Sequence, residues 1–285
     1  TRSWCMPRLI HLSDLHFGAH DARLVDAVEA RIHEEKPHLV VISGDFTQRA
    51  RTDQFKEACR FLTRLRDAGH EVLGVPGNHD VPVYDVLRRF LSPLTRYRRY
   101  VDETLCPWHE LDGAAVLGIN TARSLTFKDG RINHDQMALI RSRFADIPET
   151  RTKILVTHHP LFAMPIGEEG ALTRVVGRHE DALKAVCDAG VHILLAGHFH
   201  RSFSGSAREM VRNAGPALVI QAGTATSTRL RAGEAQSFNL VTAHANDEID
   251  VQVIEWQGTA FGGGGHARFA FDGDNWYPRP VLAEA

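Results

Sequence analysis

Short apolar runs alternate with amphipathic segments over the first two-thirds of the chain. Runs typical of buried strands lie at residues 9–12, 39–42, 71–75, 115–119, 154–156 and 193–195. Between them, residues 21–35, 53–68, 135–144 and 180–189 carry apolar side chains at helical spacing. This alternation predicts a largely buried sheet with helices on both of its faces.

The pattern changes after about residue 203. Residues 217–222, 238–243 and 249–256 have the composition of strands, and no long helix separates them. They predict a second, antiparallel sheet packed on the first. The run from Gly262 to Gly265 predicts a flexible joint. The tail beyond it contains Phe269, Phe271 and Trp276, so we expect it to pack on the body or on a second subunit as a homodimer.

Composition places the chain among globular proteins and excludes some functions. It has 285 residues, of which 43% are hydrophobic and 24% charged, and a formal net charge of −2. A near-neutral charge disfavours a duplex nucleic-acid partner, which usually meets a basic face. The four cysteines form no Cys-x-x-Cys pair, which favours free thiols. No apolar run reaches the ~18 residues of a transmembrane segment, and residues 1–7 lack the apolar stretch of a signal peptide. A cytoplasmic location is therefore expected, with Met6 as a candidate start.

Five short motifs follow predicted strands and carry the candidate chemistry. They are Asp14-Leu15-His16, Gly44-Asp45, Gly77-Asn78-His79-Asp80, His158-His159-Pro160 and Gly197-His198-Phe199-His200. Because ligands of open α/β sheets collect at the carboxyl ends of the strands, we expect the five loops to converge. Each motif alone is a weak signal, since Asp-x-His and Gly-Asp are common in turns. Their ordered combination after five strands carries the inference.

The side chains in these motifs suit a pair of metal ions. Two carboxylates, one amide and four imidazoles favour Mn or Fe, with Zn, Co or Ni as alternatives. Asp45 can bridge two ions because a carboxylate has two oxygens, and a water between the ions would act as a hydroxide nucleophile. Glycines 44, 77 and 197 each precede a candidate ligand, where a side chain would obstruct the turn. The sequence thus predicts a hydrolase of phosphate esters with two divalent metal ions as cofactors.

These motifs resemble those of the calcineurin-like metallophosphoesterases over residues 8–256. The resemblance implies a four-layer α/β/β/α sandwich of two mixed sheets flanked by helices. It implies one metal held by Asp14, His16, Asp45 and His200, and a second held by Asp45, Asn78, His158 and His198. His158 is preferred to His159 because the family pattern is His-x-Pro. It further implies that His79 faces the substrate phosphate as a catalytic residue and that Asp80 orients it.

Within the family, the motifs are most similar to those of class III cyclic-nucleotide phosphodiesterases, which implies a small phosphodiester as substrate. Two other classes of function stay open. A non-catalytic interaction module would keep the fold, although such relatives lose ligands that are all present here. A nuclease acting on short strands is compatible with the charge.

Arginines outside the motifs are candidates for substrate binding. Residues 84–108 form an insertion-like stretch with five arginines, an apolar side and Pro93, which is expected to divide it into two helices. The stretch is either a lid over the metals or a surface helix pair with a solvated arginine face. Related enzymes with lids cleave the pyrophosphate of UDP-diacylglucosamine, which gives an alternative substrate. Arg201, Arg229 and Arg231 are further candidates for phosphate contacts, and residues 257–285 are predicted to be a C-terminal extension.

Overall fold

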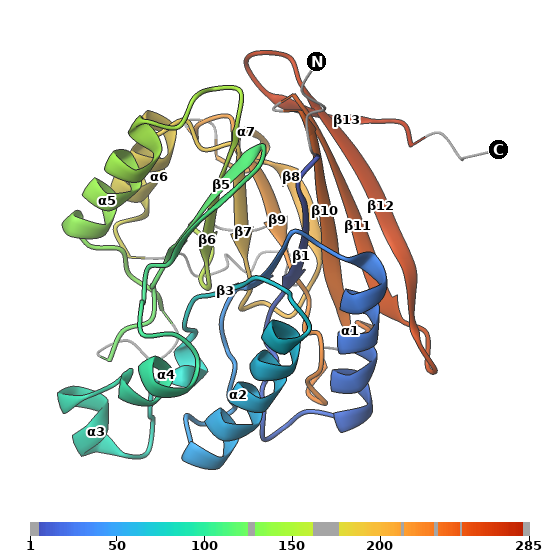
Figure 1. The fold of residues 1–285 in the computed structure, drawn as a ribbon. Coiled ribbons are helices and arrows are strands. Elements are labelled where there is room, and N and C mark those ends of the chain that lie inside the picture. Colours follow the sequence, from blue (N-terminus) through green and yellow to red (C-terminus); the bar gives the residue numbers. More distant parts are fainter. Residues whose placement is uncertain are drawn as a thin grey trace.

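Two β-sheets packed face to face form the centre of the computed structural model, which describes residues 6–124, 129–161, 177–211, 214–230, 233–245 and 247–281 (Figure 1). The seven-stranded sheet has the order β13-β12-β11-β10-β1-β2-β3, and the six-stranded sheet has the order β4-β5-β6-β7-β9-β8. The strands are β1 Arg8–Leu12, β2 Leu39–Ile42, β3 Val72–Gly74, β4 Trp108–Leu111, β5 Ala114–Ile119, β6 Thr152–Thr157, β7 Ile193–Ala196, β8 Phe203–Ser206, β9 Leu218–Gln221, β10 Ser237–Ala245, β11 Glu248–Trp256, β12 Phe261–Phe271 and β13 Trp276–Arg279.

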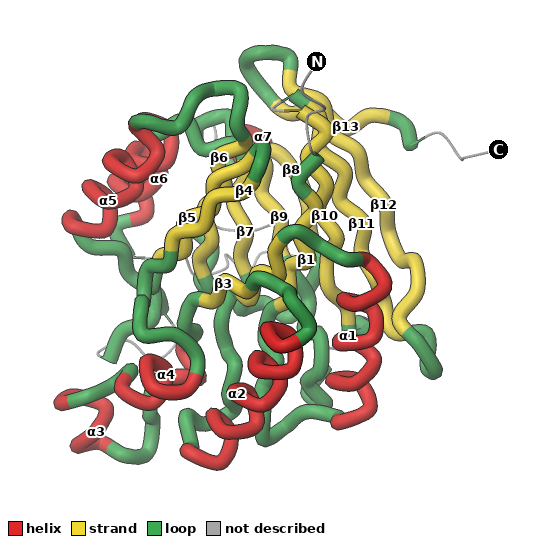
Figure 2. Tube along the Cα trace, in the orientation of Figure 1, coloured by secondary structure: helices red, strands yellow, loops and turns green. Residues whose placement is uncertain are grey.

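Helices cover the outer face of each sheet (Figure 2). Helices α1 and α2 lie on the seven-stranded sheet, and α5 and α6 lie on the six-stranded sheet. The helices are α1 Ala22–Glu35, α2 Thr52–Asp67, α3 Val86–Leu91, α4 Thr95–Tyr100, α5 His134–Ala145, α6 His179–Asp188 and α7 Ala207–Met210, with a 3-10 turn at Asn78–Asp80. The four-layer α/β/β/α architecture predicted from the sequence is confirmed.

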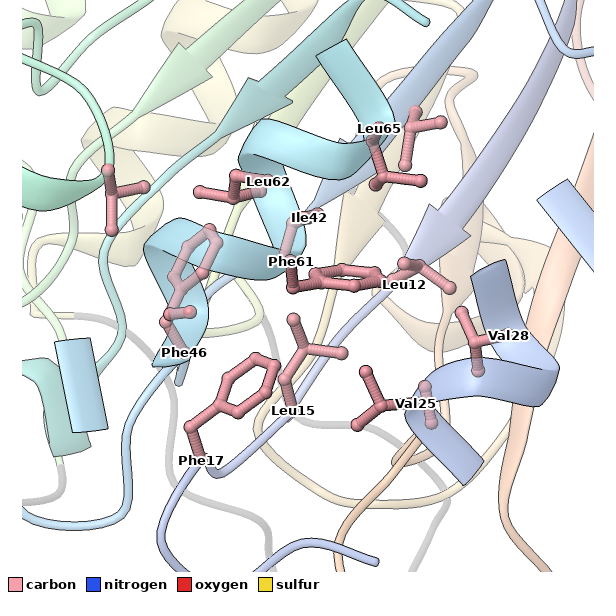
Figure 3. Close-up of a cluster of buried hydrophobic side chains, with 14 of the residues drawn as sticks. Leu12, Leu15, Phe17, Val25, Val28, Ile42, Phe46, Phe61, Leu62 and Leu65 are labelled. Carbon is pink, nitrogen blue, oxygen red and sulfur yellow. The ribbon is translucent and has the colours of Figure 1, made fainter. Parts of the chain in front are cut away.

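Alternation along the strands explains the layers. In β2, Val40 and Ile42 pack towards the helices α1 and α2, whereas Leu39 and Val41 pack between the two sheets. Because successive side chains of a strand point to opposite faces, a continuously apolar strand must be covered on both sides. Figure 3 shows the helix side of this arrangement, where Ile42 and Phe46 meet Phe61 and Leu62 of α2. The expectation that the first sheet carries helices on both of its faces is wrong, since each sheet has helices on one face and the other sheet on its second face.

The C-terminal strands do not form a sheet of their own. β10 pairs antiparallel with β1, and β11, β12 and β13 follow in turn, so that they extend the sheet begun by the N-terminal strands. β9, which was expected among them, lies in the other sheet beside β7 and β8. The prediction of a separate C-terminal sheet is therefore wrong.

The glycine run is part of a strand rather than a joint. Gly262 and Gly263 pair with Glu255 and Ile254 of β11, and a bulge follows in the register of this pair of strands. The tail after the run continues as β12 and β13, and the ring of Trp276 is buried, with its Nε1 donating to the carbonyl of Pro216. The aromatic side of the tail thus packs on the body. Backbone pairing with β11 outweighs the flexibility of glycine here.

Cys59, Cys106 and Cys187 are free thiols, as expected, and Cys5 lies outside the described residues. Among the described residues, no helix is both long enough and apolar enough to cross a membrane.

Candidate metal centre

The predicted motifs meet at one edge of the two sheets. Asp14 and His16 follow β1, Asp45 follows β2, and His158 follows β6. The loops are tied together through their backbones, since the N–H of Asp14 donates to the carbonyl of Gly44 and that of His16 donates to the carbonyl of Asp45. Gly197 N donates in the same way to the carbonyl of His158 across the six-stranded sheet. Convergence of the loops, predicted from strand ends, is observed.

One group of side chains surrounds the carboxylate of Asp14. Its Oδ1 lies 3.0 Å from Nε2 of His200 and 3.6 Å from Nε2 of His16, and these two imidazole nitrogens are 3.1 Å apart. The other oxygen, Oδ2, accepts from Ser13 Oγ at 2.5 Å and from His198 N at 3.0 Å. Asp14 is thus anchored through Oδ2 and presents Oδ1 to the two histidines.

A second group surrounds the amide of Asn78. Its Oδ1 lies 3.0 Å from both His158 Nε2 and His198 Nδ1. Asp45 stands between the two groups, with Oδ2 3.4 Å from His158 Nε2 and 3.8 Å from His16 Nε2. Its Oδ1 accepts from the N–H of His79 at 2.8 Å. A single oxygen of Asp45 therefore faces both groups, whereas the sequence argument had assumed that both oxygens would be used.

The donors of the second group fit a bound cation. His158 Nδ1 lies 2.7 Å from the carbonyl oxygen of Ser43, which can only accept, so Nδ1 carries the ring hydrogen. In the neutral ring, Nε2 is then an acceptor that faces a second acceptor, Asn78 Oδ1. With Oδ1 of Asn78 in this position, two acceptors converge, an arrangement that a proton or a cation between them would satisfy.

The pKa values of His158 and Asp45 reflect the same close packing of carboxylates and imidazoles. Burial is the largest single influence and lowers the pKa of His158, but the Asp45 and Asp14 carboxylates and the Ser43 carbonyl together outweigh it and raise this pKa to about 9. Burial opposes ionisation of Asp45 as well, yet His158, His79 and His16 together lower its pKa. The cluster thus attracts positive charge, and the lone pairs that hold a proton are those that coordinate a divalent ion.

The backbone at this edge is strained in a way that points to function. Asp14, His16, Asp45, His198 and His200 all have positive φ, between 49° and 79°. Residues other than glycine rarely adopt this left-handed backbone conformation, which costs about 1 kcal/mol or more for each residue. Five of the seven predicted ligands share this conformation, which turns their side chains towards one point.

Two glycines make the close approach of the loops achievable. A Cβ on Gly44 would lie 2.6 Å from His158 Nδ1, and one on Gly77 would overlap the carboxylate of Asp45. Gly44 also has φ +96°, whereas Gly77 has extended backbone. The predicted role of these glycines therefore holds, and at Gly77 the reason is space rather than a turn.

His79 lies at the mouth of this cluster and is oriented differently from what we predicted. Its Nδ1 lies 2.8 Å from the carbonyl oxygen of Gln48. The carboxylate of Asp80 instead accepts from Gly77 N, Phe46 N, Thr47 N and Thr47 Oγ1. We expected the Asp80 carboxylate to contact the His79 ring, but it accepts from these four donors instead. Asp80 is buried and connects the Gly77 loop to the loop after β2, which fixes the backbone of His79.

A cavity of about 610 Å³ opens over the cluster. His16, Asp45, Asn78, His79, His198 and His200 line its floor, and Gln48, Arg49, Val83, Tyr84, Phe199 and Arg229 line the rest. Of the predicted substrate arginines, Arg229 lines the cavity. Arg201 is not among the lining residues and pairs with Glu234 at 2.9 Å. Arg231 lies outside the described residues.

Sequence reasoning missed residues that support the site. Arg49 was overlooked although it follows Asp45 by four residues on the same loop and lines the cavity. Thr224 Oγ1 donates to the carbonyl of Asp14 at 2.6 Å, and Thr226 Oγ1 donates to that of Leu15 at 2.6 Å. The threonines that follow β9 were the available signal, because this strand ends at the same edge.

The insertion forms two short helices, as the position of Pro93 predicted. α4 lies beside α2, with Tyr97 of α4 buried against Phe46. Arg96 donates to the carbonyl of Ala50 and Arg89 to that of Ser124, both at 2.6 Å. Among the described residues of this insertion, only Tyr84 lines the cavity, next to Val83 just before the insertion.

Comparison with known proteins shows the family of this chain and agrees with its fold. The model of the calcineurin-like phosphoesterase family matches residues 7–202, and the chain belongs to this family. It is 29% identical over 208 residues to "Serine/threonine-protein phosphatase CPPED1" of Bos taurus, covering 67% of this chain and 62% of that protein. It is 28% identical over 207 residues to "cAMP/cGMP dual specificity phosphodiesterase MT0825" of Mycobacterium tuberculosis, covering 68% and 62%.

Solved structures show the same fold at low identity. A dimetal phosphatase from Danio rerio has a TM-score of 0.64 at 13% identity, covering 93% of this chain and 99% of that one. A purple acid phosphatase from yellow lupin has a TM-score of 0.67 at 14% identity, covering 98% and 57%. The chain spans about 62% of the length of the two curated relatives named above.

Proposed function

We propose that this chain is a dinuclear-metal phosphodiesterase that hydrolyses small phosphodiesters, with a cyclic nucleotide as the preferred candidate. The position of Asp45 Oδ2 between His16 and His158 carries the proposal. One ion would be held by Asp14, His16, His200 and Asp45, and the other by Asp45, Asn78, His158 and His198. Two divalent ions at these places, Mn or Fe foremost, supply an activated water and neutralise charge on the phosphate.

The residues of the chain itself would bind and protonate the substrate. Arg229 and Arg49 line the cavity and suit the phosphate oxygens, because one guanidinium group can donate two parallel hydrogen bonds to two oxygens of a phosphate. With Nδ1 of His79 directed to Gln48, the ring acts on substrate through Nε2, where it protonates the departing oxygen. Backbone N–H of His79 holds the bridging carboxylate of Asp45 in place at the same time.

The walls of the cavity favour a phosphate ester with an aromatic organic group. Tyr84 and Phe199 line it beside the arginines, which gives an aromatic surface for a nucleobase or another organic group. Arg49 already lies 5.6 Å above the Tyr84 ring, an arrangement that suits stacking. The similarity to a cyclic-nucleotide phosphodiesterase agrees with this proposal, whereas the similarity to CPPED1 makes a phosphomonoester the main competitor.

Two alternatives are weaker. Hydrolysis of a nucleotide-linked lipid such as UDP-diacylglucosamine would need a place for acyl chains, for which the exposed apolar side chains near Tyr84 are the candidate. A non-catalytic interaction module does not require converging carboxylate and imidazole ligands or an aligned His79, and both are present.

Comparing a diester with a monoester tests the proposal. The protein is stripped of metal, restored with Mn²⁺, and assayed on bis(p-nitrophenyl) phosphate beside p-nitrophenyl phosphate. We expect metal-dependent turnover with the diester preferred. Preference for the monoester would redirect the assignment to a phosphatase, and no turnover with both ions bound would contradict the proposal.

A further inference from the structure

Helix α3 exposes most of its apolar side chains to solvent. Tyr84 just before the helix is 77% exposed, and within it Val86 is 63%, Leu87 73%, Phe90 54% and Leu91 75% exposed. We call these five residues the α3 patch. Among the described residues, other large exposed apolar side chains are scattered at Met6, Leu230, Tyr277 and Val281. A contiguous apolar patch of this kind marks an interaction surface.

The patch is held outward by contacts on the opposite side of the helix. Arg89 Nε donates to the carbonyl of Ser124 at 2.6 Å and its Nη1 to that of Pro82 at 3.2 Å. Asp85 caps the helix by accepting from Arg88 N at 3.1 Å. Residues 86, 87, 90 and 91 form one stripe, while Arg89 lies on another side of the helix and faces the body. The apolar stripe therefore points away from the rest of the protein.

Basic charge surrounds this stripe. The insertion, residues 84–108, contains five arginines and three acidic residues, a formal charge of +2, in a chain whose net charge is −2. Arg98 and Arg99 on α4 are exposed, and the hydrogen bond of Arg96 goes to a carbonyl, which leaves its charge in place. Apolar side chains bordered by arginines are the composition of elements that lie on anionic membranes.

We propose that α3 and α4 attach this protein to the surface of an anionic lipid bilayer, with the α3 patch inserted between headgroups. A second copy of the chain is a poorer occupant, since a stable dimer buries about 800 Å² on each partner, far more than a helix of six residues offers. In Figure 1, α3 and α4 lie at the end of the molecule opposite the two termini, so that nothing described overhangs them.

Attachment would place the catalytic cavity at the membrane. Tyr84 belongs both to the patch and to the lining of the cavity, and Val83 lies next to it. The mouth of the cavity would therefore open beside the headgroups, where phosphodiesters are presented. The proposal is independent of the proposed activity, because binding to lipid needs neither metal nor turnover.

Co-sedimentation with sucrose-loaded vesicles tests it. The full chain is mixed with vesicles of phosphatidylcholine alone or of phosphatidylcholine with phosphatidylglycerol. We expect binding to the anionic vesicles and at least about tenfold weaker binding to the neutral ones. The double variant Leu87→Gln/Leu91→Gln should lose about tenfold or more in binding to anionic vesicles while it hydrolyses bis(p-nitrophenyl) phosphate like the parent. The matched control Tyr277→Gln/Val281→Gln removes exposed apolar side chains elsewhere and should bind normally.

Three results would overturn the proposal: no binding to anionic vesicles, equal binding by the α3 variant and the parent, or equal loss in the control. Sedimentation velocity tests the competing occupant, a second copy of the chain. If the parent self-associates and the α3 variant does not, a second copy is the occupant of the α3 patch. If the parent binds anionic vesicles but shows no turnover, the result counts against the phosphodiesterase proposal only.

Discussion

Nδ1 of His79 lies 2.8 Å from the carbonyl oxygen of Gln48, so a backbone group rather than a carboxylate sets the orientation of this ring. A carbonyl accepts a hydrogen bond without adding charge beside the cluster. The ring lines the cavity, where we propose that it acts on the substrate through Nε2.

His79→Ala should lower turnover of bis(p-nitrophenyl) phosphate by about 10²- to 10⁴-fold, the usual contribution of a general acid. Metal content should stay at the parent level, because Asp45 is held by the backbone N–H of residue 79, which alanine retains. Steady-state kinetics with elemental analysis of the same samples checks both statements. Gln48→Ala is the control, since it keeps the carbonyl, and it should be nearly as active as the parent. Full activity in the His79 variant would remove this residue from the mechanism.

Asn78→Ala should weaken the binding of one ion before the other. Asn78 Oδ1 contacts only the group that contains His158 and His198, whereas His16 belongs to the group around Asp14. Titration with Mn²⁺ should show one tight site remaining of two, and His16→Ala should show the reverse loss. Equal weakening of both sites in a folded Asn78 variant would contradict the division into two groups.

Asp80→Ala should lower the free energy of unfolding markedly, whereas it should change metal affinity less. Its buried carboxylate accepts from four donors, and removing it leaves these donors without a partner, at a cost of about 3 kcal/mol or more. Denaturant unfolding measures this cost. The exposed cap residue Asp85 provides the comparison, and Asp85→Ala should cost about 1 kcal/mol or less. A stable, inactive Asp80 variant would instead restore the direct role in orienting His79.

The parts of this structure that sequence predicts well are local. β2 is an uninterrupted apolar run, so its bounds and burial follow from composition, and Asp45 follows from its place at the strand end. Pairing of β10 with β1 joins residues more than 220 positions apart, and no local pattern encodes it. For this reason the C-terminal strands were assigned to the wrong sheet while their existence was recognised.

Glycines and arginines show a second limit. Gly262 to Gly265 have no side chain to signal a strand, and the ladder with β11 alone determines their conformation. Arg49 and Arg201 look alike in sequence, yet one lines the cavity and the other pairs with Glu234. Only the three-dimensional position of each loop separates them.

His192 gives a pH dependence that is separate from the metal centre. Burial lowers the pKa of His192 to about 4, and its Nδ1 accepts from Lys153 N at 2.9 Å, a contact that needs the neutral ring. The unfolded chain, with a pKa near 6.5, binds more protons between pH 6.5 and pH 4, so stability is present above pH 6.5 and falls as the pH drops through this window. The loss amounts to at most about 3 kcal/mol.

His192→Asn keeps an acceptor in place of Nδ1 and cannot be protonated in this range. Urea unfolding of the metal-free parent and variant at pH 7.5 and pH 5 measures the effect. We expect the variant to be less stable than the parent at pH 7.5, through lost packing, and to close or reverse that gap at pH 5. Because other histidines titrate equally in both proteins, the difference between the two isolates His192. A gap that stays constant with pH would show that this ring is protonated as readily in the folded state as in the unfolded one.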